Sequence, residues 1–197
     1  MATRLLRVVL TFAFLAVLVP APAIAAQPQP PSGCTILGDS APFTLLCGPA
    51  GAWNGQLVVF AHGYVAPGPQ SKADLTTAGF SQLYTADGQF LPSVLVQAGY
   101  AFLASSYRRN GLAVQEGIED TLAAVSAFRA QYPTNRVFLV GASEGGLVTA
   151  LAVERRPDAF AGGMAVCGPV GDFRNQVNYF GDFRVIFDYF FPGILPP

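Results

Sequence analysis

The sequence has few of the residues that build metal sites and nucleic-acid interfaces. It contains one histidine, His62, and three cysteines, which is too few for a dedicated zinc site. Charged residues make up only 12% of the chain, and eleven Lys and Arg stand against twelve Asp and Glu. A nucleic-acid-binding protein needs a basic surface, and this composition does not supply one. We therefore expect no metal, no cofactor and no nucleic-acid partner.

The sequence also lacks a hydrophobic run of membrane-spanning length. Residues 8–19 are almost entirely apolar, but a membrane-spanning helix needs about 20 such residues. Arg4 and Arg7 precede this run, and Ala23–Ala25 has the small-x-small pattern of a cleavage site. We predict that residues 1–26 are a secretory signal peptide, and that the protein is exported to the extracellular space or the periplasm without a membrane anchor.

Hydrophobic residues make up 52% of the chain, which excludes a disordered protein. Beyond residue 40, apolar segments typical of buried strands alternate with helical patterns. The expected strands are 43–46, 56–61, 101–107, 136–140 and 160–167, and the expected helices are 90–98, 113–132 and 146–156. The helix 113–132 carries one apolar stripe, formed by Val114, Ile118, Leu122, Val125, Phe128 and Tyr132. This alternation predicts an α/β fold with a predominantly parallel sheet and helices on both faces.

The three cysteines fit an exported protein, in which disulfides are stable. Cys34 and Cys47 are close enough in the sequence to form a bridge that would fasten the N-terminal segment. For Cys167 we favour a buried, apolar thiol, and the alternative is a partner cysteine in sequence beyond this chain.

The segment Gly141–Gly145 matches the pattern G-x-S-x-G, between a predicted strand and a predicted helix. This is the context of a nucleophile elbow, a turn so tight that Gly141 and Gly145 leave no room for side chains. The turn would hold Ser143 in a strained conformation with its Oγ exposed, and the amide of Glu144 would be one oxyanion donor. In the elbow geometry, the Glu144 side chain is expected to point away from the oxyanion. The alternative is a glycine-rich turn with an incidental serine.

A second oxyanion donor is expected directly after the strand 56–61. Gly63 permits close approach of the backbone to a substrate, so the amides of Gly63 and Tyr64 are the candidates. His62 precedes the serine by 81 residues, whereas the usual order is serine, acid, then histidine. We therefore assign His62 a supporting role in orienting this loop; the alternatives are a general base or a turn histidine without function.

Three segments, Val58–Tyr64, Ser106–Gly111 and Val140–Gly146, resemble the α/β-hydrolase superfamily. Within it, the chain is similar to secreted bacterial hydrolases of the esterase, lipase and prolyl-oligopeptidase branches. The resemblance implies that Ser143 is the nucleophile and that the amides of Glu144 and the Gly63–Tyr64 region form the oxyanion hole. It also implies an acid and a histidine contributed by later strands.

The chain departs from the superfamily pattern because no histidine follows His62 and no candidates for the last two strands are present. We expect an α/β-hydrolase fold truncated after about the sixth strand. Residues 27–42 would be a Pro-rich linker and N-terminal segment, residues 43–171 a partial core, and residues 172–197 the start of an aromatic-rich cap. The alternative for the aromatic residues of this last segment is core packing against a missing half of the protein. The implied partner is a missing C-terminal half of the same protein.

Three acidic residues near the predicted site are assigned other roles. Asp172 follows the last predicted strand, where some relatives supply the triad acid, but loop capping is the preferred interpretation. Glu119 and Asp120 lie away from the apolar stripe of their helix and are expected to be solvated.

The sequence therefore predicts a secreted serine hydrolase that cleaves carboxylic esters, with amide and peptide bonds as further candidates, and that is nearly inactive as this chain. The alternative is a non-catalytic secreted binding module on the same scaffold. A nucleotide-binding site is disfavoured, because the glycine-rich turn lacks both the G-x-G-x-x-G spacing and a P-loop lysine.

Overall fold

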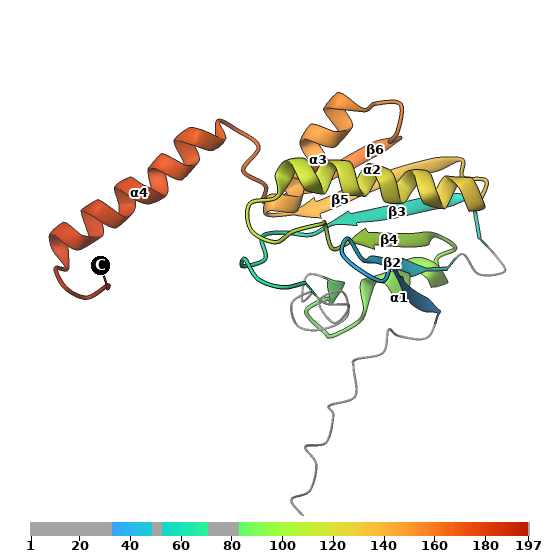
Figure 1. Ribbon diagram of the computed structural model, residues 1–197, viewed down its shortest axis with the longest axis horizontal. Coiled ribbons are helices and arrows are strands. Elements are labelled where there is room, and N and C mark those ends of the chain that lie inside the picture. The colour runs from blue at the N-terminus through green and yellow to red at the C-terminus, as the bar shows by residue number, and fades with distance from the viewer. Residues whose placement is uncertain (1–32, 49–52, 71–82, 197) are drawn as a thin grey trace, which may run out of the picture.

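The computed structural model describes residues 33–48, 53–70 and 83–196. The predicted signal peptide and the Pro-rich stretch that follows it lie outside the described residues. The described strands form one six-stranded sheet in the order β1-β2-β4-β3-β5-β6 (Figure 1). The strands are β1 Cys34–Leu37, β2 Thr44–Cys47, β3 Gln56–Ala61, β4 Ala101–Ser105, β5 Arg136–Ala142 and β6 Gly162–Val166. The helices are α1 Leu91–Gln97, α2 Val114–Gln131, α3 Glu144–Arg155 and α4 Phe173–Phe190.

The sheet is mainly parallel. The pairs β4–β3, β3–β5 and β5–β6 are parallel, whereas β2 is antiparallel to both of its neighbours. The connections from β3 to β4, from β4 to β5 and from β5 to β6 each contain a helix, as crossovers between parallel strands usually do. The fold class predicted from the alternation of strands and helices is therefore confirmed.

Helices cover both faces of the sheet and create two separate cores. On one face, α2 and α3 pack on strand residues such as Leu57, Val59 and Leu139, which are completely buried. On the other face, Leu95 and Val96 of α1 pack on a smaller cluster. Because β3 and β4 are covered on both sides, their sequences are mainly apolar rather than alternating. In β5, by contrast, buried residues alternate with half-buried ones after the exposed Arg136.

The apolar stripe predicted for residues 113–132 is the buried face of α2. Ile118, Val125 and Phe128 are buried in the larger core, and the remaining stripe residues pack against its margin. Pro133 follows the helix, which ends at Gln131. The stripe therefore sets the orientation of α2, and with it the position of the segment before α2.

The strand β1 was not predicted from the sequence, since the segment 27–42 has no clear apolar pattern. Cys34 lies directly opposite Cys47 in the β1–β2 register, and the two form a disulfide. A four-residue edge strand has little surface to bury, so the covalent bond adds the restraint that packing does not supply.

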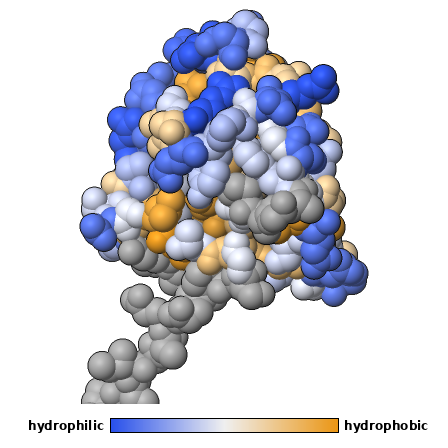
Figure 2. Space-filling model, turned by 90° about the vertical axis from the view of Figure 1, so that its right-hand side faces the viewer, coloured by the Kyte–Doolittle hydropathy of each residue, from blue (hydrophilic) through white to orange (hydrophobic). Residues whose placement is uncertain are grey.

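The helix α4 extends away from the rest of the molecule (Figure 1). Its exposed apolar side chains include Tyr179, Phe180, Phe183, Ile186 and Tyr189, which are between 56% and 79% exposed. No helix in the described residues combines the length and the hydrophobicity that crossing a membrane requires. The end of the body opposite α4, where the parallel strands begin, is by contrast largely polar, with hydrophobic residues in separate areas (Figure 2).

Candidate active site

The residue between β5 and α3 is Ser143, which is exposed at the carboxyl end of the strand. Its backbone has φ 56° and ψ −122°, a conformation that residues other than glycine rarely adopt. Hydrogen bonds of both the amide and the carbonyl of Ser143 maintain this strained conformation. The Ser143 amide donates to the Val166 carbonyl at 2.9 Å, and the Ser143 carbonyl accepts from the Gly146 amide at 2.9 Å.

The glycines around Ser143 lie where the backbone of one segment touches the backbone of another. A Cβ on Gly145 would overlap the carbonyl oxygens of Ala61 and His62, and a Cβ on Gly141 would overlap the carbonyl of Gly145. Neither obstacle is a flexible side chain that moves aside. The G-x-S-x-G pattern thus has a steric cause here, namely that α3 begins against the ends of β3 and β5.

The segment His62–Tyr64 lies beside the Ser143 turn. β3 and β5 are parallel neighbours, and their last paired residues are Ala61 and Gly141. The residues that follow each strand therefore meet at one edge of the sheet. His62 and Gly63 are buried, whereas Tyr64 is 50% exposed. The two segments named in the sequence analysis are thus brought together.

His62 is enclosed by backbone and by Tyr107. Its ring stacks on the Tyr107 ring with centroids 3.8 Å apart, and its Nδ1 donates to the Gly63 carbonyl at 2.6 Å. The Tyr107 hydroxyl donates to the His62 carbonyl at 3.1 Å. Burial raises the pKa of Tyr107, so this hydroxyl keeps its proton and remains a donor. These contacts suit the loop-orienting role assigned to His62.

The Glu144 side chain turns away from the exposed side of Ser143 and is only 5% exposed. Its Oε1 accepts a hydrogen bond of 2.6 Å from the amide of Ala113, the residue before α2. Burial raises the pKa of Glu144, and the negative charge of nearby Glu116 acts in the same direction. The carboxylate therefore connects the start of α3 to the start of α2.

The expectation that Asp120 is solvated is wrong, because this residue is 6% exposed. Its carboxylate accepts a hydrogen bond of 2.6 Å from the Arg108 backbone amide. It also accepts two from the Arg108 guanidinium, from Nη2 at 2.6 Å and from Nε at 2.9 Å. Glu119 is 47% exposed, as expected, and pairs with the same guanidinium at 2.9 Å. Helical periodicity does not reveal this burial, since the covering group is an arginine from another segment.

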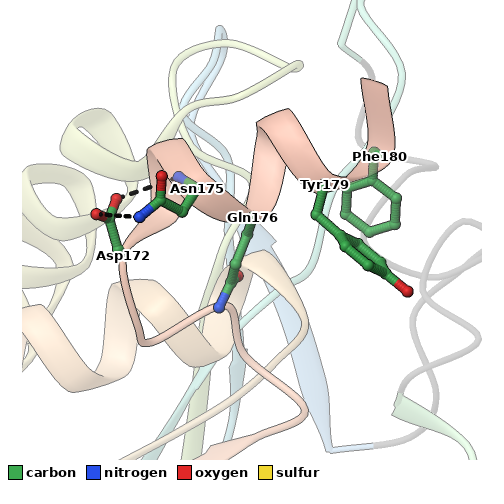
Figure 3. A pocket seen from close by; sticks show the side chains of 5 residues that line it. All are labelled: Asp172, Asn175, Gln176, Tyr179 and Phe180. Carbon is green, nitrogen blue, oxygen red and sulfur yellow. Dashed lines mark hydrogen bonds between the residues drawn. The ribbon is translucent and has the colours of Figure 1, made fainter. Parts of the chain in front are cut away.

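Asp172 caps a helix, as the preferred interpretation predicted. Its Oδ1 accepts the Asn175 amide at 3.2 Å, and its Oδ2 accepts the Asn175 side chain at 2.8 Å. Figure 3 shows this pair at one end of a pocket on α4 and the rings of Tyr179 and Phe180 at the other end. The pocket lies on α4 alone, so nothing in it brings Asp172 to Ser143.

Cys167 is exposed, and the expectation of a buried thiol is wrong. It follows β6, which has its outer edge unpaired among the described strands, so the segment is not covered as a central strand would be. Within the described residues, no group of three or more His, Cys, Asp or Glu side chains is placed to hold a metal ion.

Three contributors to this region were missed from the sequence, namely the Tyr107 hydroxyl, the Glu144 carboxylate and the Ala113 amide. Tyr107 has φ 56°, and its ring occupies the space that a side chain on Gly117 would need. A glycine inside a predicted helix signals such a close approach, so Gly117 was the available clue. The Glu144–Ala113 bond joins residues 31 positions apart and leaves no local signal.

Part of the chain is similar to one known protein family, and the fold is similar to parts of larger solved structures. Residues 95–182 match the Prolyl oligopeptidase family, and no curated protein matches the chain. Similar solved structures are Est1E from Butyrivibrio proteoclasticus (14% identity, TM-score 0.48) and a prolyl endopeptidase (20% identity, TM-score 0.47). These alignments cover 71% and 74% of this chain, but only 52% of Est1E and 24% of the endopeptidase.

The matched range includes β4, β5, the Ser143 turn, α3 and β6, but not β3. A strand that runs directly into a strained serine, followed at once by a helix, is the local structure that α/β-hydrolases use. Together with the mainly parallel sheet, these features give the described residues the fold of an α/β-hydrolase, and residues 95–182, less than half of the chain, resemble the Prolyl oligopeptidase family.

Proposed function

We propose that this chain carries the nucleophile and the oxyanion hole of a secreted serine hydrolase that cleaves carboxylic esters, and by the same chemistry amide or peptide bonds. The observation that carries the proposal is the conformation of Ser143, which is exposed and strained at the junction of β5 and α3. A backbone strained in this way is retained where it serves a function.

In the proposed reaction, Ser143 Oγ attacks the substrate carbonyl carbon, and the carbonyl oxygen gains negative charge. The amide of Glu144, in the first turn of α3, is the first donor to that oxygen, and the helix dipole favours the charge. The amides of Gly63 and Tyr64 are the candidates for the second donor, since β3 and β5 end side by side.

The proton acceptor in this proposal is not His62. That ring is buried, stacked on Tyr107 and bonded to the Gly63 carbonyl, a setting suited to holding the loop. His62 is the chain's one histidine. We therefore propose that a further part of the same protein supplies the catalytic histidine and acid, and that this chain alone retains only slow acylation.

Secretion is part of the proposal and has two supports. One is the signal-peptide pattern of residues 1–26, and the other is the Cys34–Cys47 disulfide, which is typical of proteins from oxidising compartments.

The test is acylation of Ser143 by p-nitrophenyl acetate, followed by intact-mass spectrometry and peptide mapping. We expect a slow acetyl adduct on Ser143 that is absent from Ser143→Ala. Ser126→Ala is the matched control, because Ser126 is an exposed serine of α2 and should leave the adduct in place. Absence of the adduct, or an adduct that persists in Ser143→Ala, would refute the proposed nucleophile and favour the binding-module alternative.

A further inference from the structure

The two proposed oxyanion donors belong to segments that the sheet does not connect directly. The β3–β5 pairing ends at Ala61 and Gly141, before either donor segment begins. The Ser143 amide donates its hydrogen bond to the Val166 carbonyl of β6 and not to a residue of β3. An oxyanion hole works only when its donors are held in place before the charge develops. The backbone of Gly145 packs on the Ala61 and His62 carbonyls, and a further brace that reaches both segments would add to the restraint that this contact supplies.

The segment Tyr107–Ala113, between β4 and α2, contacts both donor segments. At its start, the Tyr107 ring stacks on His62, and the Tyr107 hydroxyl donates a hydrogen bond to the His62 carbonyl. At its end, the Ala113 amide donates to the Glu144 carboxylate. One continuous stretch thus touches the residue before Gly63 and the side chain of the residue after Ser143.

This segment is itself firmly held. Arg108 is bound to buried Asp120 of α2 through its backbone amide and its guanidinium. The Gly111 amide donates to the Val65 carbonyl at 2.8 Å, which ties the segment to the residues after Tyr64. Gln70 bonds both the Ser106 carbonyl and the Asn110 side chain, each at 2.9 Å.

The Glu144 carboxylate is buried but makes only one hydrogen bond among the described residues. It is buried, and its Oε2 has no hydrogen-bond partner among the residues that the structure describes. Buried carboxylates without full hydrogen bonding destabilise a fold, so packing alone would favour an apolar residue here. The single bond that it makes, to Ala113, is what the residue contributes.

We propose that Tyr107 and Glu144 are positioning residues that fix the two oxyanion donors relative to each other through the segment Tyr107–Ala113. The inference rests on the proposed function, because it assigns a purpose to the same site. It also makes a claim that is independent of chemistry, namely that disturbing the Glu144 carboxylate, whose one hydrogen bond among the described residues is to Ala113, alters the backbone at Gly63 and Tyr64.

The experiment measures backbone ¹⁵N order parameters in the full chain and the rate of Ser143 acetylation by p-nitrophenyl acetate. The variants are Tyr107→Phe, Glu144→Ala and Glu144→Gln, the last of which keeps an oxygen that accepts from Ala113. Matched controls are Tyr132→Phe, at a partly buried tyrosine whose hydroxyl is not part of this brace, and Glu154→Ala, at an exposed glutamate of the same helix α3.

We expect Gly63 and Tyr64 to change from rigid, with order parameters of about 0.85, to below about 0.7 in Tyr107→Phe and in Glu144→Ala. Acetylation should slow about tenfold in both variants, as expected for the loss of one hydrogen bond. Glu144→Gln should restore both readouts, and the two controls should match the unmodified chain.

The outcomes separate the inference from the function. If Gly63 and Tyr64 keep their order parameters in Glu144→Ala and Tyr107→Phe, the inference is overturned whatever the acetylation rate. If the unmodified chain is never acetylated on Ser143, the proposed function fails and the brace loses its catalytic purpose. Slower acetylation together with looser Gly63 and Tyr64, reversed by Glu144→Gln, supports both.

Discussion

The turn around Ser143 is tightly packed against neighbouring segments, whereas the helix α4 is largely exposed. At the turn, glycine backbones touch other backbones, and Glu144 is buried although it is charged. On α4, large aromatic side chains are exposed, and a Cβ on Gly181 would meet open space beyond the backbone of its own helix. The effect of a residue on stability therefore depends on its place in the fold as well as on its type.

The comparison also separates two kinds of sequence signal. The turn is specified by contacts that tolerate little change, so a short motif there predicts structure. The helix α4 is specified by its own backbone and the Asp172 cap, since its apolar side chains are mostly exposed. Substitutions in the two regions should consequently differ in sign as well as in size.

The largest difference is expected between Gly145→Ala in α3 and Gly181→Ala in α4. A Cβ at Gly145 meets the Ala61 and His62 carbonyls, which are fixed in the strand and the loop, so Gly145→Ala should destabilise the fold by at least ~3 kcal/mol. Gly181→Ala enters open space in a helix and should stabilise α4 by up to ~1 kcal/mol.

Urea unfolding, followed by circular dichroism, measures both variants. Gly181→Ala serves as the control for the intrinsic helix preference of alanine. A Gly145→Ala protein as stable as the unmodified chain would show that α3 does not start as tightly against β3 as described.

The next largest effect concerns neighbouring acids of α2. Asp120→Ala removes the acceptor of one amide and of a guanidinium from the segment that follows β4, so we expect a loss of ~2–3 kcal/mol. Glu119→Ala breaks an exposed ion pair with the same arginine and should cost less than ~0.5 kcal/mol. Equal losses in the two variants, measured by urea unfolding, would contradict the burial of Asp120.

The fate of these acids shows what the sequence can and cannot predict. The apolar periodicity of α2 and the apolar runs of β3 and β5 indicate that these elements pack on other apolar elements. The fold class was therefore predictable from the sequence. Asp120 and Glu144 are buried by groups from distant segments, Arg108 and Ala113, and no spacing rule encodes such partners. The Ser143 turn was predictable because its restrictions are local.

A smaller effect is expected in the pH dependence of stability. Burial raises the pKa of Glu144 above its ordinary value of 4.5, so the folded chain holds this proton to a higher pH than the unfolded chain does. Stability should therefore decrease as pH rises from 4.5 through the raised pKa, where the folded state binds more protons.

Glu144→Gln removes the titrating group and should therefore lose less stability as pH rises. Its side-chain oxygen still accepts the hydrogen bond from the Ala113 amide. Urea unfolding across the acid-to-neutral range tests this, with Glu154→Gln as the exposed control in the same helix. If Glu144→Gln follows the same pH profile as the unmodified chain, Glu144 is not the group responsible.

The smallest effect on stability is expected on α4. Phe180 and Tyr189 are 71% and 79% exposed, so the double substitution Phe180→Ser and Tyr189→Ser removes little buried surface. We expect the free energy of unfolding to change by less than ~0.5 kcal/mol, whereas Phe128→Ala, at a ring that is 3% exposed, should cost ~3–5 kcal/mol. The double variant should also self-associate less, as measured by sedimentation velocity, because exposed aromatic patches promote association. If it instead loses as much stability as Phe128→Ala, α4 packs against the body in solution, and the contrast between the two regions does not hold.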